Sequence, residues 1–274
     1  MIIIIITAAF AFVLALILGT ALGFFSEFFA VPKDPLAERI REVLPGANCG
    51  ACGFPGCDNY AAAVAAGNAG VNICSVGGAA VAEKIAEITG VNAGAVIQTV
   101  TVLSCQGSKN HVKFKGTYTG LATCRGAKLS AGGIKLCAWG CLGFGDCVKV
   151  CKFDALDMGK DGLPKVDYAK CTGCRICINE CPQQILKSVP RDQKGAIPLC
   201  SNRNPVKAMV GRGCKIGCIK CGLCVKNCPQ NCINLDSNIP VIDLSKCTSC
   251  GTCVEKCPTK ALKILERDVF TAAG

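Results

Sequence analysis

The chain opens on an uninterrupted apolar run. Residues 2–25 include no charged side chain, and a helix of this length would extend about 36 Å against a hydrocarbon core of about 30 Å. We therefore predict a single transmembrane helix within residues 1–26. A cleaved signal peptide is the alternative, but the run lacks a basic n-region and is longer than the usual h-region of roughly 7 to 15 residues. Lys33, Arg39 and Arg41 follow the run and no basic residue precedes it, so the positive-inside rule places the rest of the chain on the cytoplasmic side of the cell membrane.

Behind the apolar run, the hydrophobic pattern indicates short elements. Asp34 and Pro35 have the character of an N-cap and a first helical position, and an amphipathic helix follows them. We predict further helices over 58–66 and 77–89, a β-prone segment over 96–103 and a loop over 126–133.

Cysteine is the most informative residue type in the composition. The chain has 25 cysteines among 274 residues, with three Tyr and one Trp. The count is odd and the spacing is that of metal ligands, which must be thiolates, so a reducing compartment is expected rather than a disulfide framework. The chain lacks a G-x-G-x-x-G motif, a P-loop and an H-E-x-x-H motif, so we expect no nucleotide site on it.

Three runs match C-x2-C-x2-C-x3-C-P without deviation and begin at Cys171, Cys218 and Cys247. In bacterial ferredoxins the first three thiolates of such a run bind one [4Fe-4S] cluster, and the fourth binds the neighbouring cluster. Runs must therefore act in pairs. A looser block precedes them, with wider spacing and Lys152 in the place of the proline; it consists of Cys137, Cys141, Cys147 and Cys151.

Pairing the blocks in chain order predicts four clusters in two tandem ferredoxin-like modules, over residues 131–190 and 205–268. An internal repeat supports this, because the residues leading into Cys171 resemble those leading into Cys247. Residues 92–130 are predicted as a linker or a small β-containing region. The expected quartets are Cys137, Cys141, Cys147 and Cys181; Cys171, Cys174, Cys177 and Cys151; Cys218, Cys221, Cys224 and Cys257; and Cys247, Cys250, Cys253 and Cys228.

A fifth quartet lies in a predicted N-terminal 4Fe-4S domain of residues 27–91, where glycines allow the backbone to close around a cluster. It consists of Cys49, Cys52, Cys57 and Cys74. Four-cysteine zinc sites share the C-x2-C spacing, so zinc is the alternative cofactor for every quartet. Zinc is a stronger alternative for this quartet than for the others, because its spacing is less diagnostic of an iron-sulfur cluster. Zinc sites do not require the third cysteine or the proline of the ferredoxin runs. Five [4Fe-4S] clusters are therefore expected.

Five cysteines remain outside these quartets. Cys232 is expected to be a small buried apolar side chain. Two alternatives stay open for the other four: buried thiols, or a dispersed sixth cluster on Cys105, Cys124, Cys200 and Cys214. His111, the one histidine, is expected to be a surface residue.

The formal net charge of +11 would suit a nucleic-acid partner, but it counts each cysteine as neutral. An oxidised [4Fe-4S] cluster with four thiolates carries about −2, so five clusters bring the chain close to neutrality. We expect no nucleic-acid partner.

The order of three motifs along the chain is distinctive. The chain begins with an apolar helix and continues with Asn48-Cys49-Gly-Ala-Cys52-Gly-Phe-Pro-Gly-Cys57 and a later Cys74. The third motif is Cys141-Leu-Gly-Phe-Gly-Asp-Cys147-Val-Lys-Val-Cys151. In this order the chain resembles the B subunit of the Rnf electron transport complex, in the longer form with a second ferredoxin pair. The widened first block and Lys152 depart from the family pattern.

The resemblance implies a subunit of a membrane ferredoxin:NAD oxidoreductase that pumps sodium ions or protons. It implies that the chain accepts electrons from soluble ferredoxin, that its other partners are further Rnf subunits, and that the flavin and nicotinamide sites lie on those subunits. The twenty paired cysteines would be the cluster ligands.

The expected fold class is α+β, with one transmembrane helix, a small iron-sulfur domain and two tandem bacterial-type 2[4Fe-4S] ferredoxin-like modules. A wiring subunit of a hydrogenase or a formate dehydrogenase is the alternative. Such a subunit would use the same modules but should lack the domain of residues 48–74 directly behind an N-terminal anchor.

Overall fold

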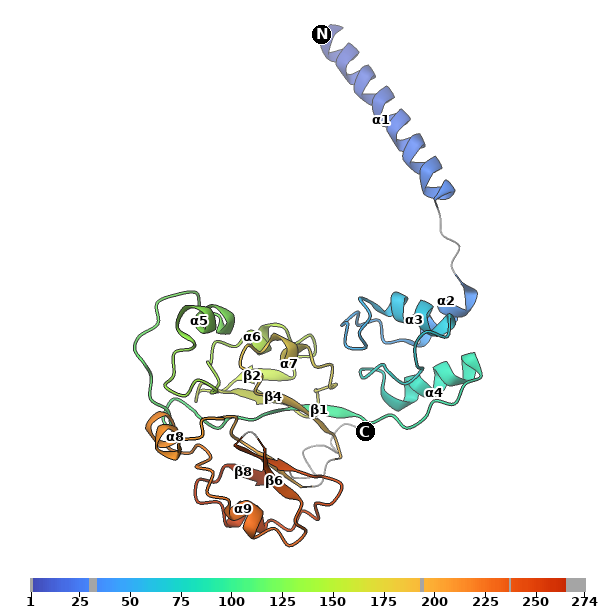
Figure 1. Cartoon of the computed structure of the whole chain (residues 1–274). Helices are drawn as coiled ribbons and strands as arrows, with labels where there is room; N and C mark the ends of the chain where they lie inside the picture. The colour runs from blue at the N-terminus through green and yellow to red at the C-terminus, as the bar shows by residue number, and fades with distance from the viewer. Residues whose placement is uncertain (1, 30–33, 193–194, 237, 265–274) are drawn as a thin grey trace.

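The computed structural model describes residues 2–29, 34–192, 195–236 and 238–264. It begins with the predicted apolar helix, α1 (Ile2–Phe28) (Figure 1). In the described part of the chain, Ile2–Ser26 is the one stretch of helix long and apolar enough to cross a membrane, and none of it is buried in the protein. The hydroxyls of Thr7 and Thr20 donate to carbonyls one turn earlier, at 3.0 and 2.8 Å. The polar groups of these two side chains are thus satisfied within the helix, as an apolar solvent requires.

Three helices form the N-terminal domain: α2 (Pro35–Val43), α3 (Cys57–Ala65) and α4 (Gly78–Thr89). The predicted cap of α2 is confirmed, because the Asp34 carboxylate accepts a hydrogen bond from the backbone N–H of Leu36 at 2.8 Å. Gly90 ends α4 in the left-handed conformation (φ 70°) that favours glycine. The apolar faces of the helices meet in a core around Ile40, Tyr60 and Ile85.

The rest of the chain is built twice on one plan, in which an outer pair of antiparallel strands accompanies an inner hairpin and two short helices. In the first module the outer pair is β1 (Thr99–Leu103) with β4 (Leu186–Pro190), the hairpin is β2 (Leu156–Met158) with β3 (Pro164–Val166), and the helices are α6 (Asp146–Lys149) and α7 (Ile176–Glu180). In the second module the corresponding elements are β5 (Ala196–Pro198) with β8 (Leu262–Ile264), β6 (Ile233–Asp236) with β7 (Ile239–Ile242), and α9 (Leu223–Lys226) with α10 (Thr252–Glu255). Ile197 of β5 shares a buried core with Val100 and Val102 of β1, so the modules pack on each other.

In each module an insertion separates the first strand from the first ferredoxin helix. The insertions are residues 104–145, which contain α5 (Cys124–Ala131), and residues 199–222, which contain α8 (Lys207–Gly213). They lie together on one side of the two modules (Figure 1). A β-bridge joins Val112 to Cys214, and the Ser201 hydroxyl donates to the Ser104 carbonyl at 2.9 Å. We call these two insertions together the junction.

The prediction of a loop over 126–133 was wrong, because α5 occupies most of this range. The Thr123 hydroxyl caps the helix by accepting from the Gly126 N–H at 3.0 Å, and Gly132 (φ 63°) ends it. The three glycines and two polar residues of this range conceal a helix whose two caps are both present in the sequence.

Candidate iron-sulfur sites

We group 24 of the 25 cysteines into six quartets by the cavities that they line, by the electrostatic interactions between their thiols and, for Cys49, by its place in the sequence. Within the described residues, no group of three or more His, Cys, Asp or Glu side chains converges on the position of a single metal ion. Several quartets instead line small cavities. We number the quartets by their spatial order: site 1, Cys49, Cys52, Cys57 and Cys74; site 2, Cys151, Cys171, Cys174 and Cys177; site 3, Cys124, Cys141, Cys147 and Cys181; site 4, Cys105, Cys137, Cys200 and Cys214; site 5, Cys218, Cys221, Cys224 and Cys257; and site 6, Cys228, Cys247, Cys250 and Cys253.

Site 1 lies between the loop of residues 46–56 and the segment before α4. The Asn48 side chain accepts from the N–H of Cys57 at 2.8 Å, which fixes the loop against the start of α3. The N–H of Gly77 donates to the sulfur of Cys74 at 3.3 Å. Burial raises the pKa of the Cys74 thiol, and the neighbouring thiols of Cys52 and Cys57 raise it further. Cys52, Cys57 and Cys74 thus lie close together, and a backbone donor is directed at the sulfur of Cys74.

Site 2 is the quartet expected from the sequence, and strand β1 contributes polar groups to it. The Thr101 N–H donates to the sulfur of Cys171 at 3.5 Å, and the Thr101 hydroxyl lies 3.6 Å from the sulfur of Cys177. Burial raises the pKa of the Cys177 thiol to about 11, and the thiols of Cys174, Cys171 and Cys151 add to this. Hydrogen bonds to cluster sulfurs are one means by which a protein sets a reduction potential, so β1 is more than a linker.

Site 3 differs from the predicted grouping, because Cys124 takes the place expected for Cys137. Cys124 lines one cavity together with Cys141, Cys147 and Cys181. Burial raises the pKa of Cys147 to about 12, and Cys124 and Cys181 are the first of the neighbouring thiols that add to this effect. The fourth member therefore comes from α5, outside the ferredoxin block.

The register of the two modules explains this exchange. Cys141 and Cys147 are separated by the same six positions as Cys218 and Cys224, and Phe144 stands where the second module has Cys221. The thiol of Cys124 accepts backbone hydrogen bonds from Asp146 and Phe144, although burial still raises its pKa. The first block is thus not widened: its middle cysteine is missing, and α5 delivers a thiol to the vacant position.

Site 4 lies at the junction and draws on both modules. Cys105, Cys137, Cys200 and Cys214 line one small cavity. Burial raises the pKa of Cys137 to about 11, and the other three thiols raise it as well. Three of the four cysteines considered for a dispersed sixth cluster are here, with Cys137 in place of Cys124.

An internal repeat relates the two halves of site 4. Cys105 follows β1 by two residues and Cys200 follows β5 by two residues. Cys137 precedes Cys141 by four residues, as Cys214 precedes Cys218. This repeated C-x3-C pattern is the sequence signal that distinguishes Cys137 from the ligands of the ferredoxin block, and the sequence-based grouping missed it.

Sites 5 and 6 have the groupings predicted from the ferredoxin runs. Burial raises the pKa of Cys218, and Cys257 and Cys221 are among the thiols that add to it. At site 6 the quartet lines one small cavity, and the additional cysteine Cys232 lines the same cavity. Cys232 is 4% exposed and its sulfur lies 3.4 Å from that of Cys228. Burial and the Cys228 thiol raise the pKa of Cys232 to about 12, so we expect Cys232 to stay protonated and to donate to Cys228.

Unpartnered polar groups around the quartets fit an anionic cofactor. The side chains of Ser75 and Ser249 are next to site cysteines in the sequence, and their buried hydroxyls have no hydrogen-bond partner among the described residues. The Lys220 ammonium group is also buried and without a partner. Desolvation lowers its pKa, whereas nearby Cys218, Cys200 and Cys137 oppose this shift. Because a buried charge is stable only when it is compensated, this lysine fits a negatively charged cluster beside it.

The sites follow one another in a row, as contacts between neighbouring quartets show. Electrostatic interactions link Cys49 to Cys174, Cys177 to Cys147, and Cys224 to Cys253. At the centre, the N–H of Cys141 donates to the sulfur of Cys105 at 3.4 Å. The N–H of Cys218 makes the equivalent hydrogen bond to Cys200. Site 4 therefore bridges the two modules.

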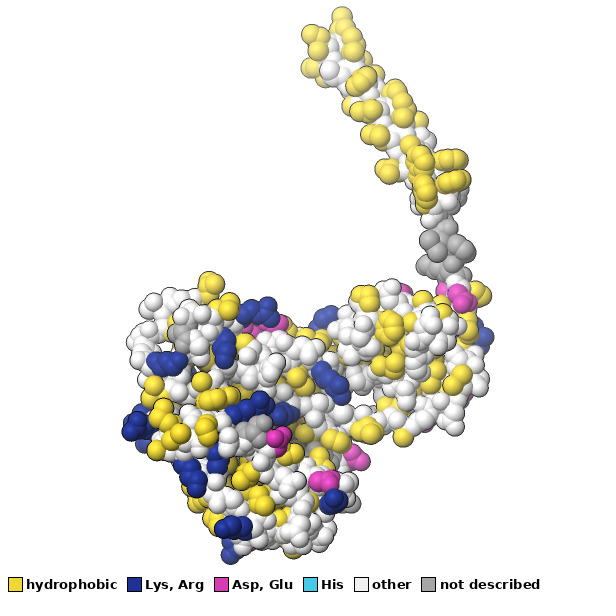
Figure 2. Space-filling view, viewed as in Figure 1, with side chains coloured by type: hydrophobic (Ala, Val, Ile, Leu, Met, Phe, Trp, Pro, Cys, Tyr) yellow, Lys and Arg dark blue, Asp and Glu magenta, His cyan; other side chains and the backbone are white. Residues whose placement is uncertain are grey.

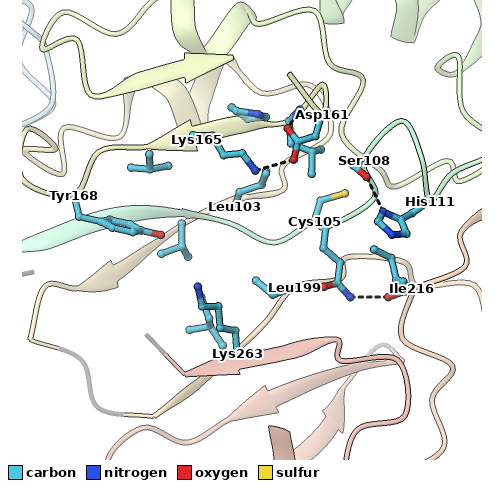
Figure 3. A pocket seen from close by; sticks show the side chains of 16 residues that line it. Leu103, Cys105, Ser108, His111, Asp161, Lys165, Tyr168, Leu199, Ile216 and Lys263 are labelled. Atoms are coloured by element: carbon cyan, nitrogen blue, oxygen red, sulfur yellow. Dashed lines mark hydrogen bonds and ion pairs between the residues drawn. The ribbon is translucent and has the colours of Figure 1, made fainter. Parts of the chain in front are cut away.

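A further cavity opens between the modules and has Cys105 in its wall (Figure 3). Four of its polar side chains form two pairs with one another. His111, which is exposed, lies 2.7 Å from the Ser108 hydroxyl, and Lys165 forms an ion pair with Asp161 at 2.7 Å. We assign no ligand to this cavity.

Comparisons with known proteins identify iron-sulfur domains in three segments of the chain. Family models match residues 44–76 (putative Fe-S cluster), 163–186 (4Fe-4S binding domain) and 217–261 (4Fe-4S dicluster domain). The chain is 42% identical over 236 residues to the B subunit of the Na+-translocating ferredoxin:NAD+ oxidoreductase complex of Acetobacterium woodii, and the match covers 86% of this chain and 70% of the relative. It is 41% identical to the B subunit of the proton-translocating ferredoxin:NAD+ oxidoreductase complex of Clostridium ljungdahlii, over 86% and 82%. It is 38% identical to the B subunit of an ion-translocating oxidoreductase complex of Methanosarcina acetivorans, over 90% and 92%.

Proposed function

Since the chain belongs to the B-subunit family of Rnf-type ion-translocating oxidoreductase complexes, we propose that it is the iron-sulfur electron-transfer subunit of such a complex. It accepts electrons from reduced ferredoxin and passes them to the membrane subunits, which reduce NAD and translocate sodium ions or protons. The chain itself binds no nucleotide.

The observation that carries this proposal is the continuous row of six thiol quartets. A [4Fe-4S] cluster in each would supply a one-electron carrier. The chain's own residues set the order of the carriers, bury some of the thiols, and direct backbone N–H groups and Thr101 toward the sulfurs. We propose the twenty cysteines predicted from the sequence as ligands, together with Cys105, Cys124, Cys200 and Cys214.

Site 4 raises the proposed number of clusters from five to six. Without it, the nearest quartets of the two modules would be sites 3 and 5, on either side of the junction. Cys105 and Cys200 accept hydrogen bonds from the first cysteine of each ferredoxin block at these sites, Cys141 and Cys218. A carrier at site 4 makes the row continuous.

We also propose that α1 anchors the chain as a single-pass protein of the cell membrane, with the iron-sulfur domains on the cytoplasmic side. The charge-free helix and the basic residues that follow it support this orientation. The N-terminal domain follows α1 directly, so site 1 is the site nearest to the membrane along the chain.

Anaerobically purified full-length protein tests the proposal. We expect about 24 iron and 24 acid-labile sulfide per chain. Stoichiometric zinc with little sulfide would reject the electron-transfer function in favour of a zinc scaffold.

A wiring subunit of a hydrogenase or a formate dehydrogenase stays as the second candidate. Similarity over most of the length of the B-subunit relatives favours the Rnf-type complex. Identification of the subunits that copurify with the native chain separates the two.

A further inference from the structure

Two segments of the chain are free of acidic residues. Residues 88–145 contain six Lys or Arg and residues 193–235 contain seven, and neither segment contains Asp or Glu. The N-terminal domain is the reverse, with three basic and six acidic residues over 34–91. The positive charge of the chain is therefore concentrated away from the domain next to α1.

The fold brings these segments together at the junction. The N–H of Lys113 donates to the Gly213 carbonyl at 3.1 Å, and the N–H of Lys215 donates to the His111 carbonyl at 2.9 Å. Lys113, Lys207, Arg212 and Lys215 are exposed, and none of them forms an ion pair with a carboxylate of the described residues. Such unneutralised charges produce a local positive potential.

Apolar side chains lie among these basic residues. Phe114, Leu136, Val206 and Met209 are 43%, 48%, 52% and 48% exposed. The N–H of Leu136 donates to the Lys113 carbonyl at 2.9 Å, and the backbone of Leu136 packs on Gly213 at the end of α8. Around α8, Figure 2 shows hydrophobic side chains interspersed with Lys and Arg. We call these eight residues the basic patch: Lys113, Phe114, Leu136, Val206, Lys207, Met209, Arg212 and Lys215.

The basic patch lies directly over site 4. Leu136 precedes Cys137, and Gly213 precedes Cys214. A protein seated on the patch would be separated from these thiols by little more than one layer of residues. An apolar centre with a charged rim is the usual anatomy of a protein interface.

We propose that the basic patch is the docking surface for a small acidic electron-transfer protein, and that electrons enter the row at site 4. This inference rests on the proposed function, in which the donor is reduced ferredoxin. The donor would lose one electron and be oxidised, and a [4Fe-4S] cluster held by the four thiols of site 4 would accept that electron, with no bond made or broken. From site 4 the row leads through sites 3 and 2 to site 1.

Charge complementarity favours an acidic protein over the alternatives. An anionic membrane surface is less suitable, because the patch lies across the first module from the N-terminal domain that continues into α1 (Figure 1). Electrostatic steering would raise the association rate of an acidic donor and make it sensitive to salt.

The test compares two charge-reversed variants in the assembled full-length complex. The patch variant carries Lys113→Glu and Arg212→Glu. The control carries Lys246→Glu and Lys256→Glu, which change the same number of exposed charges in the second module. Stopped-flow bleaching measures the second-order rate of reduction by reduced ferredoxin at low and high salt, and dithionite reduction reports whether the clusters are intact.

We expect the patch variant to be about tenfold or more slower at low salt, with the deficit shrinking at about 1 M salt as the Debye length falls to about 3 Å. The control should change less than about twofold, and dithionite should reduce all three proteins equally. A large loss in the control alone would overturn the inference and place the docking surface on the second module. An unchanged patch variant that has lost affinity for anionic vesicles or for another subunit would overturn it as well. A wild-type chain that dithionite reduces and ferredoxin does not would instead reject the proposed function.

Discussion

Paired cysteine substitutions test how the quartets are grouped. Cys105 and Cys137 line one cavity at site 4, whereas Cys124 lines the cavity of site 3. Because each site holds four irons, Cys105→Ala with Cys137→Ala removes one site, and Cys105→Ala with Cys124→Ala removes two. From about 24 irons per chain, we expect about 20 in the first variant and about 16 in the second.

Which of the two double variants loses more iron distinguishes the two groupings of the cysteines. The sequence alone places Cys137 with Cys141, Cys147 and Cys181. In the alternative with a dispersed sixth cluster, Cys124 belongs with Cys105, and that grouping gives the reverse result, about 16 irons and about 20. Iron and acid-labile sulfide are measured on anaerobically purified protein against the amino-acid concentration. Cys232→Ala is the control and should keep about 24 irons, because Cys232 is the one cysteine outside the six quartets. Equal iron in both double variants would refute the grouping.

Three further changes follow from the geometry. Phe144→Cys added to Cys124→Ala should restore about four irons, because residue 144 occupies the position in the first module that Cys221 occupies in the second. An iron content no higher than that of Cys124→Ala would contradict this correspondence. Tyr60→Phe should cost about 1 kcal/mol, because the buried hydroxyl donates to the Gly70 carbonyl at 2.8 Å. Burial raises the pKa of Tyr60 from 10.0 to about 12. The hydroxyl's contribution to the free energy of unfolding is therefore present below pH 10 and is lost as the pH rises through about 12. Urea unfolding of the full chain should show this alkaline loss of stability in the wild type and a weaker one in the variant. Removal of residues 1–26 should give a soluble protein that keeps its iron, because α1 is exposed and holds no cysteine; loss of the ferredoxin chromophore would show that α1 supports the folded domains.

The sequence predicts the elements that depend on local pattern. The apolar helix, the cap at Asp34, the end of α4 at Gly90 and the strand around Val100 each follow from a few neighbouring residues. The groupings at sites 2, 5 and 6 also follow, because the fourth cysteine of each ferredoxin run lies at a fixed distance from the other three.

Local pattern does not predict a ligand position that is filled from a distant segment. Cys124 reaches the place of Phe144 only because Thr123 caps α5 and the Arg125 N–H donates to Asp146 at 3.1 Å. Site 4 depends on the packing of two insertions that are nearly 100 residues apart in the chain. The sequence indicates site 4 only through the internal repeat, in which Cys137 and Cys214 each stand four residues before a ferredoxin cysteine.

In the proposed function, electrons cross this chain and leave it through site 1. Cys57→Ala in the assembled complex interrupts that route at its exit, because Cys57 belongs to site 1 and lies outside the tandem modules. Ferredoxin should still reduce the remaining clusters of the variant, while ferredoxin-dependent NAD reduction is abolished. Near-normal NAD reduction, with the site 1 cluster shown by EPR to be absent, would contradict this route.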